Sequence, residues 1–217
     1  MGNAGKSQEV TAPELGRKGA YVLRNRLALL RSTQEVLAAK GQETTIEDIA
    51  EHAQVAVSTV YKHFKDKDAL IEATLMHVFA EWEQWAESFV KDSPDPLEQL
   101  VFPMRLFVRL HQTHPHHAQT IVNYFDVVAK LLPLAQAKMI AGITALAKAK
   151  VISCEDPTAA ARNMHAVMSF AVINQVNNPK ATAEDADKTV RIALSMLGIS
   201  EAKARKLTES KILDSKV

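Results

Sequence analysis

The sequence contains little of what secreted and membrane proteins need. It has one cysteine, Cys154, in 217 residues. A lone cysteine forms no disulfide within the chain and is typical of a reducing compartment. No stretch of about 18 apolar residues without charge occurs, so no membrane span is expected. The first residues lack the apolar core of a secretory signal. We therefore expect a cytoplasmic protein without a membrane partner.

Catalytic and cofactor motifs are also missing. The chain has seven glycines, and none stands in the G-x-G-x-x-G or G-x-x-x-x-G-K-S/T order of a phosphate-binding loop. Neither G-x-S-x-G nor H-E-x-x-H is present. Cys154 lies beside Glu155 and Asp156, whose negative charges disfavour a reactive thiolate. We expect no catalytic residues and no cofactor.

Charge is balanced overall but distributed unevenly along the chain. The formal net charge is +1, which does not by itself indicate a nucleic-acid-binding protein. The segment 15–34, however, has five basic residues and no acidic one: Arg17, Lys18, Arg24, Arg26 and Arg31. This segment is either a solvated helix face or a phosphate-binding patch.

The stretch Thr44–Leu75 has the clearest pattern in the chain. Apolar residues at i, i+3, i+4 and i+7 predict two short helices, near 45–53 and 57–64. Thr45, with Asp48 three residues later, forms a capping box that starts the first helix. The residues between the helices leave room only for a tight turn. Such a pair is a helix-turn-helix, although a plain helical hairpin has the same periodicity.

The outer face of the second helix has side chains suited to DNA. Ser58 and Thr59 lie at its amino end, where free backbone N–H groups and the helix dipole favour phosphate. Tyr61, Lys62 and His63 point toward the flanking sugar-phosphate backbone. We therefore interpret the second helix as a recognition helix.

The residue order over 44–71 closely resembles the DNA-binding signature of the TetR family of bacterial transcription regulators. The matching letters are T-T-I-E-D-I-A, then A-x-V, then S-T-V-Y-K-H-F-K-D-K-D-A-L. A looser likeness extends back to Arg24. One position departs, because Gln54 stands where the family usually has glycine. A positive φ in that turn costs a non-glycine residue about 1 kcal/mol.

The resemblance implies an all-α fold, in which a three-helix DNA-binding head is joined by a continuous helix to a helical ligand-binding and dimerisation domain. We expect a disordered arm over 1–19, the helix-turn-helix domain over 20–66 and the second domain over 67–217. Contacts to double-stranded operator DNA are expected from residues of the head and from the first residue of the second domain: Arg24, Thr44, Thr45, Ala56, Val57, Ser58, Thr59, Tyr61, Lys62, His63 and Lys67.

Prolines and acidic caps predict the remaining helices. A fourth helix runs without interruption over 68–91 as a rigid rod. Pro103 is expected to bend or break the helix that follows it. The other predicted helices span about 95–114, 116–132, 133–150, 157–177 and 183–197, with a short charged helix from Ser200.

Half of the eight histidines gather between His111 and His117. Zinc needs three or four converging ligands, and no second cluster of cysteine, histidine or carboxylate is evident. We therefore interpret these histidines as wall or surface residues of a helix-connecting corner. A metal-dependent enzyme that uses the segment 111–117 is the less favoured alternative.

Large apolar residues of the middle region are either plain core or, as the resemblance implies, partly the lining of an effector cavity. Between positions 101 and 154 there are six Lys or Arg residues and one acid, which gives a weakly cationic rim. We expect a partly apolar small-molecule effector of unknown identity. Its expected contacts are Phe79, Trp82, Trp85, Phe102, Arg105, Phe107, His111, Asn123, Tyr124, Met164 and Met168.

Two late helices have apolar faces that either close the core of one chain or join two subunits. In the family, the two penultimate long helices pair with those of a second subunit. One helix-turn-helix reads only half a site, so we expect a homodimer. The faces predicted for it are Ala161, Met164, His165, Met168, Ala171, Val172 and Gln175, and Val190, Ala193, Leu194 and Leu197.

Together these features predict a repressor that binds a palindromic operator as a homodimer and is released by a small-molecule effector. The alternative is an activator or global regulator that has the same head and no small ligand.

Overall fold

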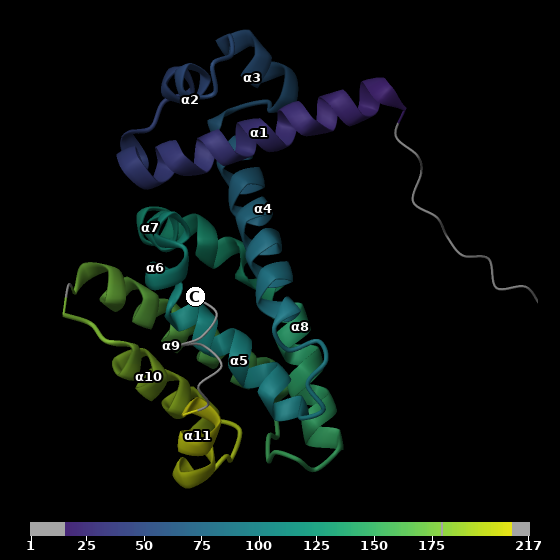
Figure 1. Ribbon diagram of the computed structural model, residues 1–217, viewed down its shortest axis with the longest axis vertical. Helices are drawn as coiled ribbons and strands as arrows, with labels where there is room; N and C mark the ends of the chain where they lie inside the picture. Colours follow the sequence, from purple (N-terminus) through teal and green to yellow (C-terminus); the bar gives the residue numbers. More distant parts are fainter. Residues whose placement is uncertain (1–15, 179, 210–217) are drawn as a thin grey trace, which may run out of the picture.

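The computed structural model describes residues 16–178 and 180–209, without the side chains of residues 18, 134 and 135. Most of the predicted arm, residues 1–15, lies outside this part of the chain. Within the described residues every regular element is helical and no strand occurs (Figure 1). The prediction of an all-α fold is therefore confirmed.

The amino-terminal elements form a head in which a long helix lies across two short ones (Figure 1). They are α1 (Arg17–Lys40), the 3-10 turn η1 (Gly41–Glu43), α2 (Ile46–His52) and α3 (Val57–His63). The first helix begins three residues before position 20, where the head domain was expected to begin. A small core holds these elements together, and it also includes the start of the next helix: Leu29, Leu30, Val36, Ile46, Ile49, Ala50, Val60, Phe64 and Leu70.

Local chemistry explains the ends of α2. The hydroxyl of Thr45 accepts a hydrogen bond from the Asp48 N–H at 3.1 Å, and the Asp48 carboxylate accepts one from the Thr45 N–H at 2.9 Å. This is the predicted capping box. Gln54 follows α2 with a φ of 55°, so the turn has the positive φ that was expected at this position.

Helix α4 (Lys67–Ser88) leaves the head as one uninterrupted rod (Figure 1). Its length of 22 residues corresponds to about 33 Å. The Asp66 carboxylate caps it by accepting from the Ala69 N–H at 2.8 Å. Leu70 packs in the core of the head, whereas Ile71 and Leu75 pack in the larger core below. A single rigid element therefore belongs to both cores.

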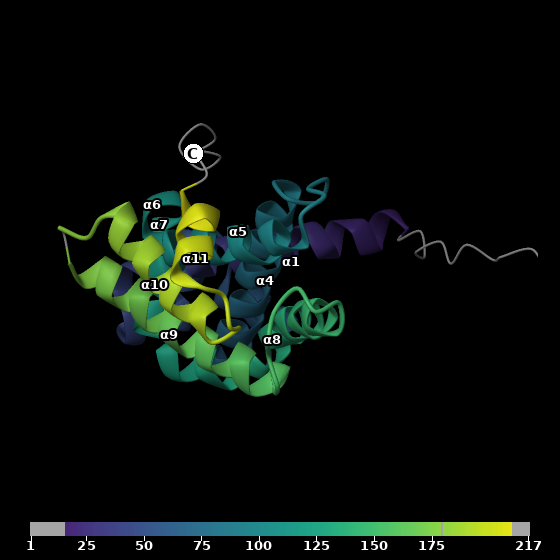
Figure 2. The ribbon, with the colours of Figure 1, turned by 90° about the horizontal axis from the view of Figure 1, so that it is seen from below.

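The rest of the chain forms a helical body around α5. The helices are α5 (Pro96–Val108), α6 (Leu110–Thr113), α7 (Pro115–Asn123), α8 (Phe125–Lys148), α9 (Pro157–Asn177), α10 (Ala183–Ser195) and α11 (Glu201–Thr208). Helix α5 packs against α4, α8, α9, α10 and α11. Seen from below, α8 and α10 lie on opposite sides of the body (Figure 2).

Three helix boundaries differ from the predictions. Helix α5 continues through Pro103, because packing of the buried Phe102 and Met104 holds the helix around the proline. The predicted helix over 116–132 breaks at Tyr124. Pro133 lies inside α8 instead of opening a helix, and α8 bends there by 47°. A proline inside a helix removes one hydrogen bond, so it bends a helix that tertiary packing maintains.

In the part of the chain that the structure describes, no single helix has both the length and the apolarity of a membrane span. The two arms of the bent α8 meet those criteria only when they are taken together.

Candidate nucleic-acid interface and regulatory core

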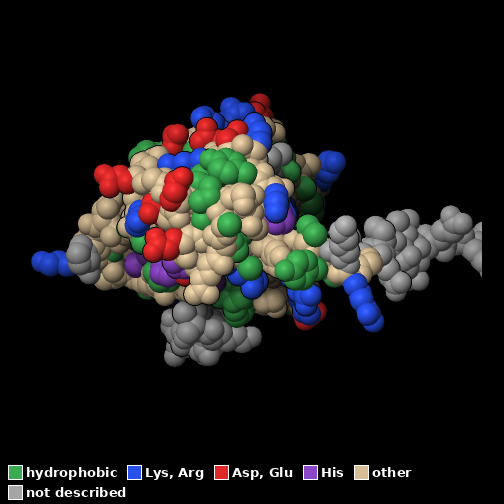
Figure 3. Space-filling view, turned by 90° about the horizontal axis from the view of Figure 1, so that it is seen from above, with side chains coloured by type: hydrophobic (Ala, Val, Ile, Leu, Met, Phe, Trp, Pro, Cys, Tyr) green, Lys and Arg blue, Asp and Glu red, His purple; other side chains and the backbone are tan. Residues whose placement is uncertain are grey.

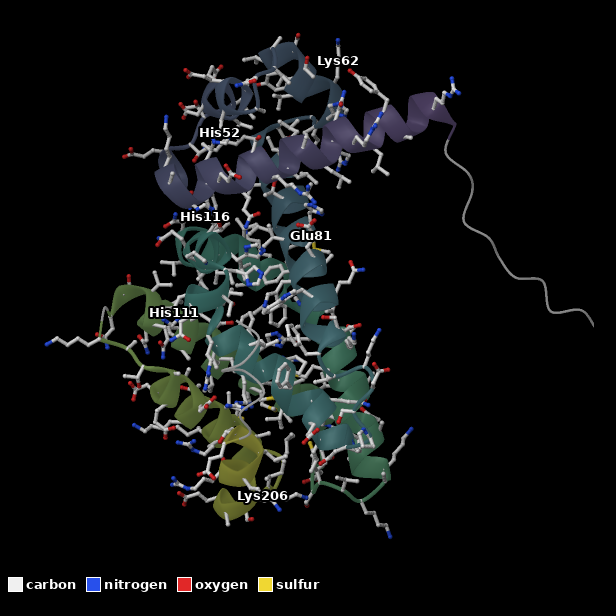
Figure 4. The ribbon with its side chains drawn as sticks, viewed as in Figure 1. His52, Lys62, Glu81, His111, His116 and Lys206 are labelled. Carbon is white, nitrogen blue, oxygen red and sulfur yellow. The ribbon has the colours of Figure 1, made fainter. Side chains whose placement is uncertain are left out.

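Several side chains on the outer surface of α3 are exposed to solvent. Lys62 points outward at the top of the molecule (Figure 4), and the side chain of Tyr61 is 52% exposed. Ser58 is exposed as well, whereas Val60 is fully buried on the opposite face. Helix α3 begins at Ala56 without a side-chain cap, unlike α2 and α4. The arrangement presents hydroxyl, phenol and ammonium groups together on one face.

The other residues predicted to contact DNA are distributed around this face. Arg24, Thr45 and Ala56 are exposed, and Val57, Thr59, His63 and Lys67 are half-buried. Thr44 differs, because it is 1% exposed and its hydroxyl donates to the Gly41 carbonyl at 2.8 Å. The side chain of Thr44 therefore faces the interior of the head, unlike the exposed residues of this set.

Two basic residues brace the recognition helix from neighbouring elements. The Arg26 guanidinium lies over the Phe64 ring, 4.2 Å from its centroid. It also donates to the His63 carbonyl at 3.2 Å. Lys67 Nζ donates to the Gln42 carbonyl at 3.3 Å. The Arg26 contacts hold the carboxyl end of α3 against α1, and the Lys67 bond joins the start of α4 to η1.

Charge is divided over the top of the molecule (Figure 3). Acidic side chains gather in the left half of this view, whereas Lys and Arg side chains protrude at the right, near the amino end of α1. Helix α2 contributes Glu47, Asp48 and Glu51, and α1 contributes Arg17 and Arg24. The amino half of α1 is therefore the basic flank of the recognition helix.

A second connection between head and body lies beside α4, at the break between α7 and α8. Asn123 Nδ2 donates to the carbonyls of Leu37 and Ala38, at 3.0 and 3.4 Å. The Tyr124 hydroxyl donates to the Gly41 carbonyl at 2.5 Å. Burial raises the pKa of Tyr124. We call these bonds the α1 clamp, since side chains of the body bond the carboxyl end of α1.

Two further bonds strengthen this junction. Gln42 Nε2 donates to the Asn123 carbonyl at 2.6 Å, and Gln34 Nε2 lies 2.7 Å from His117 Nδ1. Burial lowers the pKa of His117 to about 4, so its ring is neutral at pH 7 and Nδ1 accepts the bond. The Trp85 ring on α4 then contacts His114, which in turn contacts His117.

The residues predicted to bind an effector separate into distinct groups. Asn123 and Tyr124 belong to the α1 clamp, and Trp85 contacts His114 beside it. Phe102 lies in a small cluster near the end of α4. Arg105 donates to both oxygens of Asp187 at 3.0 and 3.1 Å. The remaining six lie in or beside the central core of the body: Phe79, Trp82, Phe107, His111, Met164 and Met168.

The pairing of Arg105 is part of a buried ion cluster that the sequence analysis missed. Arg109 Nη2 also donates to Asp187, at 2.6 Å. The three side chains are nearly inaccessible to solvent. They join α5 to α10 across about 80 positions of sequence. No local pattern marks such a distant partner.

The central core contains several polar atoms without a partner. Phe107 lies between two rings, with its centroid 5.5 Å from that of Trp82 and 6.1 Å from that of His165. Among the described residues, no hydrogen-bond partner reaches the buried atoms Trp82 Nε1, His111 Nδ1, His165 Nδ1 and Ser169 Oγ. Burial lowers the pKa of His165 to about 4, so this ring is uncharged at pH 7. The region is therefore apolar in its packing but has unused hydrogen-bonding capacity.

Two hollows are found elsewhere on the molecule. One, of about 300 Å³, lies between the end of α4, the start of α5 and α11, and Phe102 is the only predicted ligand contact that lines it. The other, of about 260 Å³, lies between α1 and α7.

The faces predicted for subunit association need a correction. Met164, Met168 and Val172 on α9, and Val190 and Leu194 on α10, are buried within this chain. They close its own core, which is the alternative that the pattern left open. The exposed large apolar residues on the same helices are instead Phe170, Ile192 and Met196, at 57%, 58% and 36% exposure.

The segment of histidines does not converge on one point. His116 is exposed, and His114 and His117 take part in the ring contacts described above. His111 lies on α6, apart from His116 (Figure 4). Within residues 16–178 and 180–209, no three His, Cys, Asp or Glu side chains gather as metal ligands would.

Comparison with known sequences identifies the head. Residues 29–74 match the family model described as bacterial regulatory proteins, tetR family, which confirms the resemblance. The repressor KstR2 of Mycolicibacterium smegmatis is 30% identical over 110 residues, which are 50% of this chain and 52% of that protein. KstR2 of Mycobacterium tuberculosis is 29% identical over 119 residues, 54% of this chain and 58% of that protein. The matches thus span little more than half the length of these relatives.

Solved structures resemble the whole fold. RolR in complex with resorcinol superposes with a TM-score of 0.72 and 18% identity, covering 88% of this chain and 95% of RolR. FadR of Bacillus subtilis in complex with stearoyl-CoA superposes with a TM-score of 0.67 and 16% identity, covering 78% and 98%. At these identities the likeness establishes the fold alone, in which the head is joined to a body of helices.

Proposed function

We propose that this chain, whose helix-turn-helix head belongs to the TetR family, is a transcriptional repressor that binds a palindromic operator as a homodimer and is released by a small molecule. The observation that supports this most directly is the geometry of α3. Its inner residue Val60 is fixed in the core of the head, while Ser58, Tyr61 and Lys62 face outward on a rigid helix. Helices that read DNA present side chains in this way.

In this proposal, phosphate contacts orient the head and α3 enters the major groove. Lys62, Tyr61 and Arg24 supply backbone contacts, which position a protein without selecting a sequence. Ser58 and Thr59 lie where short hydroxyls meet base edges. Lys67 donates to the Gln42 carbonyl at 3.3 Å. It must therefore release this carbonyl before it can contact a phosphate.

The second subunit is proposed to pack on α9 and α10. Phe170, Ile192 and Met196 expose large apolar side chains on these two adjacent helices. Exposed apolar side chains gathered on neighbouring elements mark interaction surfaces. A two-fold axis there brings the same residues of both subunits together. Two heads then meet half-sites about 34–36 Å apart on one face of the DNA.

Release is proposed to act through two connections at once. Helix α4 is rigid and belongs to both cores, so a ligand that moves its second half also moves the head. The α1 clamp joins α1 to the break between α7 and α8, so a shift of those helices moves α1 as well. A ligand that binds only one arrangement of the body lowers operator affinity by population shift.

The test begins with selection of bound sequences from random double-stranded DNA by the full chain. We expect a palindrome whose half-sites are one helical turn apart, bound by a dimer. Transcription in vitro from a promoter that overlaps the selected site should then fall when protein is added. An increase in transcription would favour the alternative of an activator, and failure to select any sequence would refute operator binding.

A further inference from the structure

The most unusual feature of the body is a group of buried polar atoms that have no partner. Proteins pair the large majority of their buried polar side-chain atoms. Here Trp82 Nε1, His165 Nδ1 and Ser169 Oγ are all buried, and nothing among the described residues bonds them. An atom of this kind is destabilising in an empty core but favourable where a ligand completes its hydrogen bond.

These atoms share one region of the core. Phe107 on α5 makes edge contacts with both rings, at 73° to Trp82 of α4 and 74° to His165 of α9. Ser169 follows His165 by four residues on α9, so the two side chains lie on the same face of that helix. The sticks in Figure 4 show this interior between α4, α5 and α9 filled with side chains.

Resting on the proposed function, we infer that Trp82, Phe107, His165 and Ser169 form the effector site, and that the effector is a small, uncharged aromatic molecule with hydroxyl groups. The indole N–H only donates, so the ligand must offer an acceptor oxygen there. A phenolic O–H can both donate and accept a hydrogen bond. It therefore suits the neutral imidazole of His165 and the hydroxyl of Ser169, each of which can take either role. The Phe107 ring favours a planar body that makes edge or offset contacts.

The charge of the surroundings decides against ionic ligands. His165 is neutral at pH 7, because burial lowers its pKa to about 4. The buried guanidinium groups of Arg105 and Arg109 bond Asp187. A carboxylate or phosphate beside Trp82 would therefore lose its hydration without a dedicated counter-charge, which is costly in a core.

The apolar side chains around the site can move to admit such a ligand. Met164 and Met168 flank His165 along α9 and belong to the same core as Phe107. Methionine is flexible and repacks more readily than branched side chains. Trp82 lies on α4, the rod that continues into the head. Occupation of the site therefore acts directly on an element that positions the recognition helix.

The experiment is calorimetric titration of the full chain at pH 7 with four probes: phenol, resorcinol, benzoate and stearoyl-CoA. We expect resorcinol to bind more tightly than phenol, because a second hydroxyl completes a second bond. Benzoate and stearoyl-CoA should bind at least about tenfold more weakly than resorcinol. Resorcinol should also lower affinity for the selected operator.

Two variants and one control locate the site. His165→Leu and Ser169→Ala each remove a hydrogen-bonding atom and should weaken resorcinol binding about tenfold. The melting temperature should be unchanged or higher, because each change also removes an unpaired buried atom. Ser88→Ala, at the exposed end of α4, should leave resorcinol affinity within about twofold. Loss of affinity together with a lower melting temperature would indicate a structural role instead.

Failure of this inference differs from failure of the proposed function. If stearoyl-CoA or benzoate binds and releases DNA while resorcinol does not, the ligand class is wrong and the repressor remains. If resorcinol binds equally well to wild type, His165→Leu and Ser169→Ala, the site is wrong. If the chain selects no DNA sequence, the proposed function itself is refuted, whatever the probes bind.

Discussion

The head and the body differ in where they place their polar residues. In the head, Ser58, Tyr61 and Lys62 of α3 lie on the surface, and the capping bonds of α2 join two close neighbours in sequence, Thr45 and Asp48. In the body, Arg105, Arg109 and Asp187 are buried and bond across the fold. A surface reader of DNA needs its polar groups free for a partner, whereas a regulatory core uses them to fix one arrangement of helices.

The largest expected effect is on the buried ion cluster. Asp187→Ala removes the carboxylate shared by Arg105 and Arg109, and we expect the free energy of unfolding to fall by about 3–5 kcal/mol. Urea denaturation measures this change. The matched control is Glu184→Ala, an exposed carboxylate on the same helix that pairs with Arg191, where we expect a much smaller loss, because solvent screens exposed ion pairs. Equal losses would show that burial does not distinguish the two carboxylates.

Subunit association provides the second comparison. Ile192→Asp places a charge in the proposed interface and should weaken dimerisation by about 2 kcal/mol or more. Operator affinity should fall with it, because two linked heads are needed. Met76→Asp alters another exposed apolar residue, on α4, and should leave the dimer intact. Light scattering that finds an unchanged dimer for Ile192→Asp would place the interface on other helices.

A variant of the α1 clamp tests how strongly these hydrogen bonds connect the body to the head. Tyr124→Phe removes the hydroxyl that donates to the Gly41 carbonyl and should cost about 1–2 kcal/mol. Amide exchange near the carboxyl end of α1 should become faster. Tyr21→Phe, an exposed tyrosine on the same α1, should change neither quantity. Unchanged exchange in Tyr124→Phe would show that α4 alone connects the two regions.

The recognition helix should respond mainly in its DNA affinity. Lys62→Ala removes one phosphate contact, which we expect to weaken operator binding about tenfold and to reduce the salt slope by about one unit. Its melting temperature should not change, since Lys62 is exposed. Lys203→Ala on α11 removes the same charge far from the head and serves as the control. If both variants lose equal affinity, net charge and not docking explains the effect.

The sequence predicted local features better than distant ones. The capping box at Thr45 forms as expected, and the helices predicted to start at 157 and 183 do start there, after caps at Asp156 and Thr182. Each capping bond joins residues two or three positions apart. The turn at Gln54 was also predicted from its neighbours. Helix existence in the body followed from proline and cap positions, although Pro133 lies inside α8 instead of opening a helix.

The regulatory core was less predictable, for a physical reason. Asn123 and Asp187 take their partners from positions about 80 residues away, and no periodicity reports such pairs. Apolar faces on α9 also fail to distinguish a core from an interface, since both need the same side chains. Only packing shows that Met168 is buried in this chain while Phe170 is exposed.

The smallest expected effect concerns backbone strain, which occurs in both regions. Gln54 in the head and Lys150 in the body have φ values of 55° and 57°, where a side chain is unfavourable. Gln54→Gly relieves about 1 kcal/mol of strain and loses about half of that through the greater freedom of glycine in the unfolded chain. We expect a net gain of about 0.5 kcal/mol, and the same for Lys150→Gly. Glu72→Gly, in the exposed middle of α4, should instead lose about 1 kcal/mol. Thermal unfolding of the three variants measures these differences. A lower stability of Gln54→Gly would mean that the Gln54 side chain stabilises the turn by more than the backbone strain destabilises it.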